Sequence, residues 1–279
     1  MTLAFVPYAL SVPEEPRPHT AFLLHGILGN HTNWRTFART LSEELPDWRF
    51  LLVDLRNHGL SEHPPGPHTL AAAADDLERL AAQEGAPEVV MGHSYGGKVT
   101  LEYASRRPAG LRQAWVLDAT PQAEPHGPGD DNEVLTVISA LRAVPQPLDK
   151  RQDVMVALAH QGMSPMIQRW MTTNLQRTDE GFVWTFDLDA AEEMIGDYFR
   201  QDLWEPLETT ALDAPALHLV RAGRSDRWTP DVMERLDRLS PSAAATVHVL
   251  PDAGHWVHVD APDALRTLLV EHWPAERSP

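Results

Sequence analysis

The pentapeptide at residues 92–96, G-H-S-Y-G, constrains this chain more than any other stretch of its sequence. A short apolar run at 88–91 precedes it and is typical of a strand, whereas residues 97–104, which follow it, favour a helix. The pattern G-x-S-x-G between a strand and a helix is typical of a sharp turn that exposes the serine hydroxyl at its tip. Glycine on both sides lets the backbone close without Cβ clashes. The sequence therefore predicts that Ser94 is a nucleophile at the carboxyl end of a strand.

Strand and helix patterns alternate around this turn. Apolar runs without polar alternation, typical of strands covered on both faces, occur at 20–24, 49–54 and 114–118. Helical patterns occur at 33–44 and 69–83. This alternation predicts an α/β fold with a mostly parallel central sheet flanked by helices. Because ligands of such sheets bind beyond the carboxyl ends of the strands, we expect His25, Ser94 and Asp118 to lie close to a site.

The alternation is interrupted between residues 121 and 206. Helical patterns occupy most of this segment, at 132–144, 149–160, 165–175 and 190–198, with a short extended piece at 182–186. The strand pattern returns at 216–220 and 246–250, and residues 3–11 can supply one or two edge strands. We therefore expect a core formed by 1–120 and 207–279, and a helical insertion at 121–206. The tryptophans and methionines of the insertion either fill a core of their own or line an apolar pocket over the serine.

A serine hydroxyl is a weak nucleophile without a base within hydrogen-bond reach and a carboxylate that orients the base. His255 is the candidate base among 14 histidines, because it follows the last predicted strand directly and has Gly254 beside it. His258 lies three residues further on, and H-x-x-H can indicate a metal ligand pair. Since no third ligand is evident, we expect no metal site.

Four sequence blocks carry a family resemblance. They are H-G-I-L-G at 25–29, D-L-R-N-H-G-L-S at 54–61, G-H-S-Y-G-G-K at 92–98 and G-H-W-V-H at 254–258. Together they resemble the α/β-hydrolase superfamily, and within it the group of YbfF-type esterases and abhydrolase domain-containing protein 11. The resemblance implies an α/β-hydrolase fold with a helical cap inserted after strand 6, and serine esterase or thioesterase activity without a cofactor. It also implies Ser94 as nucleophile and His255 as base.

The carboxylate partner of His255 has two candidates. Most α/β-hydrolases place the acid in a Gly-x-x-Asp turn after the seventh strand, and residues 223–226 match that turn with Asp226. The YbfF-type group uses an aspartate that ends the sixth strand, and Asp118 matches that position. Both strand ends are close enough to the elbow strand for either carboxylate to reach the histidine. We prefer Asp226 and keep Asp118 as the alternative.

Backbone amides must also point to where negative charge develops during acyl transfer. One is expected from Tyr95, the residue after the nucleophile, and the other from Ile27, which follows His25-Gly26. We expect His25 to brace this loop rather than to react. Trp34 and Trp256 are candidate walls of a substrate pocket, although a packed tryptophan is the simpler interpretation.

Composition restricts the partners. The formal net charge is −17, from 23 basic and 40 acidic residues, and such a surface repels nucleic acid and anionic membranes. The sequence has no cysteine, hence no disulfide and no thiolate metal site. The first residues lack a basic segment followed by a long apolar run, so no signal peptide is expected, and no stretch is apolar enough to span a membrane. We expect a cytoplasmic monomer or homodimer that acts on a small molecule.

The combined hypothesis is a serine hydrolase that cleaves carboxylic esters or thioesters of small to medium acyl chains through an acyl-enzyme. The same residues could serve C–C bond or amide hydrolysis or a lyase reaction, because function depends on the site and not on the fold. A non-catalytic binding protein on the same fold is the remaining alternative. Such a protein often lacks one of the catalytic residues, and here all of them are present.

Overall fold

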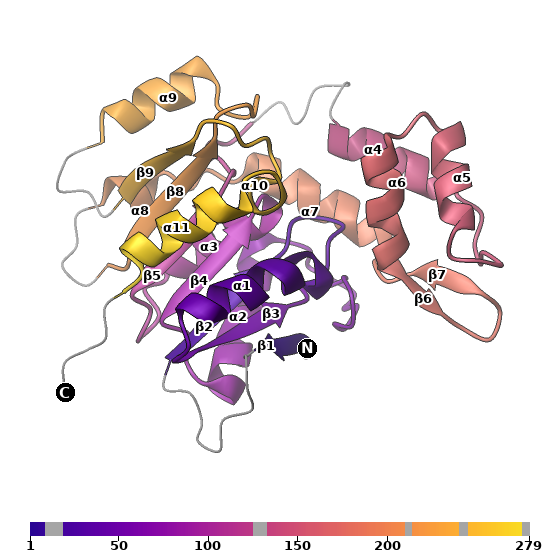
Figure 1. The fold of residues 1–279 in the computed structure, drawn as a ribbon, viewed down its shortest axis with the longest axis horizontal. Coiled ribbons are helices and arrows are strands. Elements are labelled where there is room, and N and C mark those ends of the chain that lie inside the picture. The colour runs from indigo at the N-terminus through magenta and orange to yellow at the C-terminus, as the bar shows by residue number, and fades with distance from the viewer. Residues whose placement is uncertain (9–18, 125–132, 210–213, 240–244, 275–279) are drawn as a thin grey trace.

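The computed structural model describes residues 1–8, 19–124, 133–209, 214–239 and 245–274. Seven strands form one sheet in the order β1-β3-β2-β4-β5-β8-β9. Their bounds are β1 Phe5–Tyr8, β2 His19–Leu24, β3 Trp48–Val53, β4 Val89–His93, β5 Gln113–Leu117, β8 Ala216–Ala222 and β9 Ala245–Leu250. Only the β1–β3 pair of this sheet is antiparallel, and every other pair is parallel. The prediction of a mostly parallel sheet is confirmed (Figure 1).

The central strands are buried on both faces, and successive residues face opposite sides of the sheet. In β2, Phe22 and Leu24 pack into one hydrophobic core, whereas Ala21 and Leu23 pack into the other. The first core includes residues of α2 (Leu70–Glu84) and α3 (Tyr95–Ser105), and the second includes residues of α1 (Arg35–Glu44) and α11 (Pro262–His272). This double coverage explains why these strands are continuously apolar in the sequence.

An insertion separates β5 from β8. It contains α4 (Glu133–Arg142), α5 (Asp153–His160), α6 (Pro165–Met171), α7 (Leu188–Arg200) and α8 (Glu205–Glu208), with a hairpin of β6 (Leu175–Arg177) and β7 (Phe182–Trp184). In Figure 1 the α4–α6 helices and the hairpin lie to one side of the sheet. Trp204 and Met171 are fully buried, and together with much of the insertion they belong to the core that includes α2 and α3. Within the described ranges, no helix is both long and apolar enough to cross a membrane.

Three details concern the bounds of the expected segments. The insertion follows the fifth described strand. In the range 3–11, Phe5–Tyr8 forms one edge strand, and 9–11 lie outside the described residues. Part of the helix predicted at 132–144 also precedes the described residues, which resume at Glu133. The expected boundary between 206 and 207 falls inside α8, so the insertion and the core share that helix.

One buried lysine ties the insertion to the elbow helix. The Lys98 ammonium on α3 donates hydrogen bonds to the carbonyl oxygens of Gln122 (2.8 Å), Tyr198 (2.8 Å) and Gln201 (3.0 Å). Burial lowers the pKa of Lys98 to about 8. The three acceptors come from the loop after β5 and from the end of α7, where carbonyl groups lack partners within the helix. Lys98 therefore fixes the end of α7 against the helix that begins at the nucleophile elbow.

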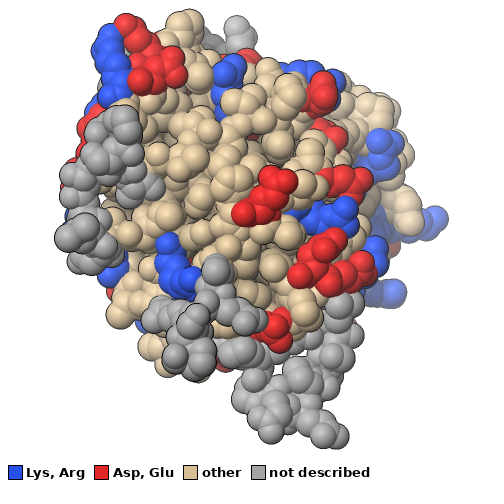
Figure 2. All heavy atoms as spheres, turned by 60° about the vertical axis from the view of Figure 1, so that its left-hand side comes forward, with Lys and Arg blue, Asp and Glu red and all other residues tan. Residues whose placement is uncertain are grey.

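Charges on the surface are mixed in sign. On the face in Figure 2, acidic and basic side chains lie beside one another toward the margins, and uncharged side chains cover most of the centre. Ion pairs at the surface include Arg142 with Asp189 at 2.6 Å and Arg235 with Glu208 at 2.7 Å. Such exposed pairs contribute little to stability, so the net charge of −17 acts mainly on solubility and on the choice of partners.

Candidate active site

Ser94 lies in the turn between β4 and α3, where its backbone has φ 53° and ψ −116°. A positive φ is strained for a residue with a side chain. Hydrogen bonds hold this conformation, because the Ser94 amide donates to the carbonyl of Leu117 at 2.9 Å and the Ser94 carbonyl accepts from the Gly97 amide at 2.8 Å. Ser94 is partly exposed, whereas His93 and Tyr95 on either side are buried. The predicted strand–turn–helix geometry is confirmed.

The glycines on either side of the serine permit close backbone approach. A Cβ on Gly92 would overlap the carbonyl oxygen of Gly96, and a Cβ on Gly96 would lie 2.5 Å from the carbonyl oxygen of His25. These obstacles are backbone atoms, which cannot rotate away as a flexible side chain can. The closure of the elbow on itself therefore requires glycine at 92, and its packing against the end of β2 requires glycine at 96.

Gly92→Ala is expected to lower the free energy of unfolding by at least about 4 kcal/mol, because the new Cβ would force the strained turn open. The matched control is Gly196→Ala in the interior of α7, where the new Cβ would meet only the mobile end of Arg200 at 3.2 Å. That change is expected to raise stability by about 0.5–1 kcal/mol. Urea unfolding measures both values, and equal effects of the two alanines would contradict the elbow packing.

His255 follows β9 and is hydrogen-bonded to Asp118 in the loop after β5. Its Nδ1 lies 2.8 Å from Oδ2 of Asp118, which is fully buried. The other carboxylate oxygen accepts hydrogen bonds from the Ala222 amide at 2.9 Å and from Nε1 of Trp228 at 2.6 Å. Burial acts to raise the pKa of Asp118, but the hydrogen bonds from His255 and Trp228 hold it below its usual range. Asp118 is therefore an ionised carboxylate at neutral pH.

The structure corrects our preference for Asp226 as the partner of His255. In the described part of the chain, His255 is hydrogen-bonded to Asp118 and not to Asp226. The strand order explains the difference, because β5 is hydrogen-bonded to the elbow strand β4, whereas β8 lies one strand further away. Asp226 is exposed in the loop after β8 and lines a second cavity beside the pocket of Ser94.

His255 has two further polar neighbours. Nε2 of His93 lies 2.8 Å from the carbonyl oxygen of His255 and fixes its backbone. Nε of Arg227 donates a hydrogen bond of 2.9 Å to Nδ1 of His255, the same nitrogen that contacts Asp118. Burial lowers the pKa of His255, the hydrogen bond with Asp118 raises it, and the charge of Arg227 lowers it, with a lowered pKa as the result. The imidazole is therefore neutral at pH 7, as a general base must be.

Trp34 and Trp256 have different environments. Trp256 lines the pocket of Ser94, in agreement with its expected place. Trp34 is fully buried beneath His258, with ring centroids 4.5 Å apart, and it is not among the residues that line that pocket. The expectation that Trp34 forms a pocket wall is therefore wrong. The short helix that contains Trp34 turns the ring into the core shared with α1, next to Phe37.

His258 is a buried histidine without a hydrogen-bond partner. Neither of its ring nitrogens has an acceptor or a donor among the described residues. Burial lowers the pKa of His258 to about 3, and the nearby His255 acts in the same direction. The side chain therefore packs as a neutral ring between Trp34 and His93, whose ring centroids lie 4.5 and 4.9 Å away.

Acid is expected to destabilise the fold through His258. The folded state holds this ring neutral down to a pKa of about 3, whereas an unfolded histidine titrates near pH 6.5, so the unfolded chain binds more protons below pH 6.5. Stability therefore falls with decreasing pH, by about 1.4 kcal/mol for this residue between pH 7.5 and 5.5. Urea unfolding measures the free energy of unfolding at the two pH values. Its decrease from pH 7.5 to 5.5 should be smaller in His258→Phe than in wild type by about 1.4 kcal/mol. Identical pH dependence in wild type and variant would contradict the assignment.

Two buried histidines hold the loop after β2. Nε2 of His25 accepts from the Leu55 amide at 3.0 Å, and Nε2 of His58 accepts from the Leu28 amide at 3.0 Å. Burial lowers the pKa of both rings, to about 3 for His58. Both are therefore neutral with the proton on Nδ1, and these contacts agree with the expected bracing role of His25. The amide of Ile27, beside that of Leu28, has no hydrogen-bond acceptor among the described residues.

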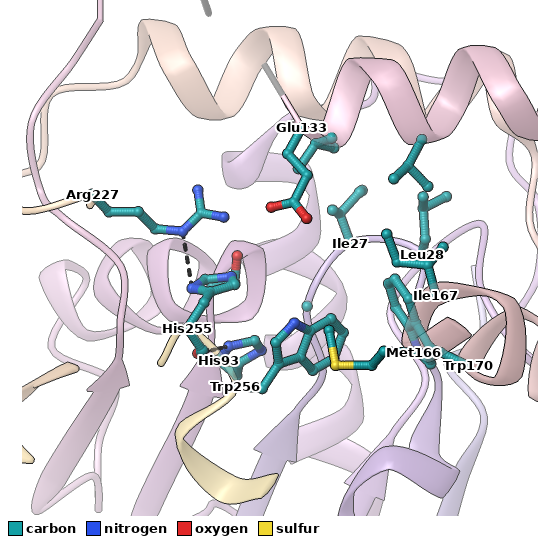
Figure 3. Close-up of a pocket in the computed structure, with 14 residues that line it drawn as sticks. Ile27, Leu28, His93, Glu133, Met166, Ile167, Trp170, Arg227, His255 and Trp256 are labelled. Atoms are coloured by element: carbon teal, nitrogen blue, oxygen red, sulfur yellow. Dashed lines mark hydrogen bonds between the residues drawn. The ribbon is translucent and has the colours of Figure 1, made fainter. Parts of the chain in front are cut away.

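The pocket at the elbow is largely apolar, and two charged side chains, Arg227 and Glu133, are among the residues that line it (Figure 3). Its floor includes Ser94, His255 and Ile27. Apolar side chains from α4 and α6 cover it, together with Trp256, and they are Val134, Val137, Met166, Ile167 and Trp170. The empty space is about 520 Å³, including solvent at the mouth. The expectation that some aromatic and methionine side chains of the insertion line a pocket is met by Met166 and Trp170.

The charged side chains, Arg227 and Glu133, were not predicted from the sequence. Arg227 immediately follows Asp226, so the turn suspected of supplying the acid did point to the correct loop but to the wrong residue. No sequence pattern predicted that Glu133 and the valines of α4 would line the pocket, because their placement depends on how the insertion packs over the elbow. In the described ranges, no three or more His, Cys, Asp or Glu side chains are grouped so that they could hold a metal ion.

Comparison with known families decides the fold family. The sequence model described as alpha/beta hydrolase fold matches residues 22–262. The chain belongs to the α/β-hydrolase family. The fold and the resemblance expected from the four sequence blocks are thereby confirmed.

This α/β hydrolase is also similar to individual proteins over most of its length. It is 31% identical over 245 residues to sn-1-specific diacylglycerol lipase ABHD11 of Mus musculus, covering 86% of this chain and 76% of that protein. It is 28% identical over 249 residues to Esterase YbfF of Escherichia coli (strain K12), covering 87% of this chain and 88% of the relative. Among solved structures, a marine microorganism esterase superposes with a TM-score of 0.78 at 23% identity, covering 97% of this chain and 98% of the other. At that identity the structural match supports the fold alone.

Proposed function

We propose that this α/β hydrolase is a serine esterase that cleaves carboxylic esters or thioesters of small to medium acyl chains. The observation that carries the proposal is the 2.8 Å contact between Asp118 and His255, in the pocket that Ser94 also lines. The contact joins a neutral base to an ionised carboxylate, and the base lines the same pocket as the candidate nucleophile. Each of the three has a role in acyl transfer. The two relatives named above, a lipase and an esterase, support the same class of reaction.

In the proposed mechanism, Ser94 attacks the ester carbonyl while Nε2 of His255 takes the hydroxyl proton. Asp118 holds the Nδ1 proton of His255, which keeps Nε2 unprotonated and stabilises the imidazolium that forms. His255 passes the proton to the leaving alkoxide, and an acyl-enzyme remains. Water activated by His255 then releases the acid. None of these reaction steps requires a cofactor or a metal.

The oxyanion of the tetrahedral intermediate would be bound by the amides of Ile27 and Tyr95. Tyr95 begins α3, and amides in the first turn of a helix lack partners within the helix. The hydrogen bonds from Leu28 to His58 and from Gly29 to Gly26 occupy the neighbouring amides of the loop and leave Ile27 available. Donors fixed in this way cost no reorganisation when negative charge develops.

The insertion at 121–206 would act as a cap that determines the size of the acyl group. Its helices α4 and α6 supply most of the apolar wall of the pocket. These walls leave a confined apolar space in front of Ser94, which suits a small to medium acyl chain. We therefore expect a maximum of activity at a short chain length.

Wild-type protein should hydrolyse p-nitrophenyl esters in a series from acetate to palmitate, with kcat/KM highest for the shorter chains. Long chains should be poor substrates, because the walls of α4 and α6 close the pocket. The release of p-nitrophenol measures the rates. A flat or absent response over the whole series would contradict a simple esterase and would direct attention to thioesters, amides and C–C substrates.

Labelling by a fluorophosphonate separates an enzyme from a binding protein on the same fold. The probe reacts with a serine only where a base and an oxyanion site activate it. Mass spectrometry of a digest should locate the label on the peptide that contains Ser94. A folded protein that resists the probe would contradict the proposed catalytic role and favour a non-catalytic α/β hydrolase.

A further inference from the structure

Arg227 contacts the catalytic histidine from the loop between β8 and α9 (Pro230–Asp237). This loop contains the Gly-x-x-Asp turn in which an acid was expected, yet Asp226 is exposed and its neighbour Arg227 contacts the histidine. Nε of Arg227 lies 2.9 Å from Nδ1 of His255, and Oδ2 of Asp118 lies 2.8 Å from the same atom. A cation and an anion therefore compete for one ring nitrogen.

The two contacts require different tautomers of His255. A guanidinium can only donate and does not lose its proton in proteins, so its bond to Nδ1 requires Nδ1 to be unprotonated. A neutral imidazole then has its proton on Nε2, and it cannot take the proton of Ser94. The contact with Asp118 requires the opposite tautomer, with the proton on Nδ1 and Nε2 free. While Arg227 donates to Nδ1, His255 is unable to act as a base, so a neutral ester is hydrolysed only by molecules in which Asp118 holds Nδ1 instead.

Arg227 is also available to a ligand. Its guanidinium lines the pocket of Ser94 and the adjoining cavity that Asp226 lines. Among the described residues, no carboxylate lies within 4.0 Å of it, although it is only partly exposed. Glu133 lines the same pocket (Figure 3), and among the described residues no ion pair joins it to Arg227. An anion is therefore favoured where the guanidinium faces the pocket of Ser94. It is disfavoured near Glu133 of α4 and in the adjoining cavity, which Glu124, Asp226 and Asp231 also line.

We propose that Arg227 selects ester substrates that carry a carboxylate, and that binding of this carboxylate draws Arg227 away from Nδ1 and releases His255 to Asp118. The inference rests on the proposed esterase function and adds a substrate class to it. A carboxylate accepts two parallel hydrogen bonds from the planar guanidinium, whereas the ring nitrogen accepts only one. The pair with the carboxylate is therefore the stronger interaction. Arg227 then acts as a specificity residue that couples recognition of the anion to the formation of the active base.

Matched substrates test the selection. Ethyl hydrogen succinate is compared with ethyl pentanoate, and acetoxyacetate with propyl acetate, so that the carboxylate is on the acyl side in one pair and on the alcohol side in the other. Wild type should prefer the anion by at least about tenfold in kcat/KM in one pair. Arg227→Met should bring that ratio close to one and raise the turnover of the neutral ester several-fold, because His255 is then held by Asp118 alone.

Arg224→Met is the control for the loss of a positive charge on the same loop. Arg224 is exposed and bonds the carbonyl of Asp252, so its removal should leave the anion preference intact. The inference is overturned if wild type discriminates in neither pair, or if Arg227→Met keeps the preference of wild type. Turnover of neutral and anionic esters at equal rates would overturn it while leaving the esterase function standing.

Nitrogen NMR tests the tautomer without any turnover. In Ser94→Ala protein with 15N-labelled histidine, the shift of Nδ1 distinguishes a protonated from an unprotonated nitrogen. Addition of succinate should move the His255 Nδ1 signal toward the protonated form in protein that retains Arg227. The same addition should have no effect in the double variant that also carries Arg227→Met, where Nδ1 is already protonated. An unchanged signal in the first protein overturns the release of His255 even if no ester is hydrolysed.

Discussion

Ser94→Ala should lower the kcat of ester hydrolysis by about 10⁵- to 10⁶-fold, to the level that binding and the oxyanion site alone provide. The elbow geometry is the reason. Ser94 is the partly exposed residue at the tip of the turn, and it lines the pocket together with His255. Alanine removes the nucleophilic oxygen but keeps a Cβ at the strained φ of 53°, so the turn itself should persist. Rates with the best p-nitrophenyl ester of the series measure the loss.

Ser105→Ala is the matched control for this prediction. Ser105 is the last residue of α3, and its hydroxyl donates only to the carbonyl of Glu102, at 2.7 Å. Its removal should leave kcat unchanged within about twofold, since it is far along the helix from the elbow. Comparable losses in the two variants would indicate a general defect of α3 and would contradict Ser94 as the nucleophile.

The elbow and the histidine could be predicted because the signals for them are local. A strand run, a G-x-S-x-G turn and a helix lie within one short stretch at 88–104, and steric exclusion at Gly92 and Gly96 leaves that stretch few alternatives. His255 was similarly found from its place directly after the last strand. The fold followed from the same kind of signal, because strands buried on both faces have continuous apolar sequences.

The choice of acid could not be made in this way, because it depends on strand order. Asp118 and Asp226 both follow strands of the parallel sheet, and the sequence does not state which strand adjoins the elbow strand. The structure shows β5 next to β4 and β8 beyond it, which brings Asp118 to Nδ1 of His255. Arg227 was missed for a related reason, since only the conformation of the loop after β8 turns residue 227 inward and leaves residue 226 exposed.

Trp34 shows the limit of arguments from residue type. A tryptophan after the loop of Ile27 is compatible both with a pocket wall and with a buried ring. The decision depends on His258, which comes from the other end of the sequence and covers the indole at a centroid distance of 4.5 Å. Long-range packing of this kind leaves no local pattern, whereas Trp256 follows His255 directly and lines the pocket.

Asp118→Asn should lower kcat by about 10⁴-fold, whereas Asp226→Asn should change it by less than about threefold. The carboxylate of Asp118 is fully buried and holds Nδ1 of His255 at 2.8 Å, while Asp226 is exposed and has no hydrogen bond to that ring among the described residues. An amide in place of Asp118 no longer requires a proton on Nδ1, so the histidine adopts the tautomer with Nε2 protonated. Single-turnover and steady-state rates on one ester measure both variants.

Equal and small losses in the two variants would contradict a single acid and would mean that the carboxylates replace one another. Arg227 should make the loss in Asp118→Asn more severe, because it donates to Nδ1 and would favour the tautomer with Nε2 protonated. Adding Arg227→Met to Asp118→Asn should therefore recover part of the activity on a neutral ester. Full additivity of the two changes would show that Arg227 and Asp118 do not act on the same nitrogen, contrary to their distances of 2.9 and 2.8 Å from it.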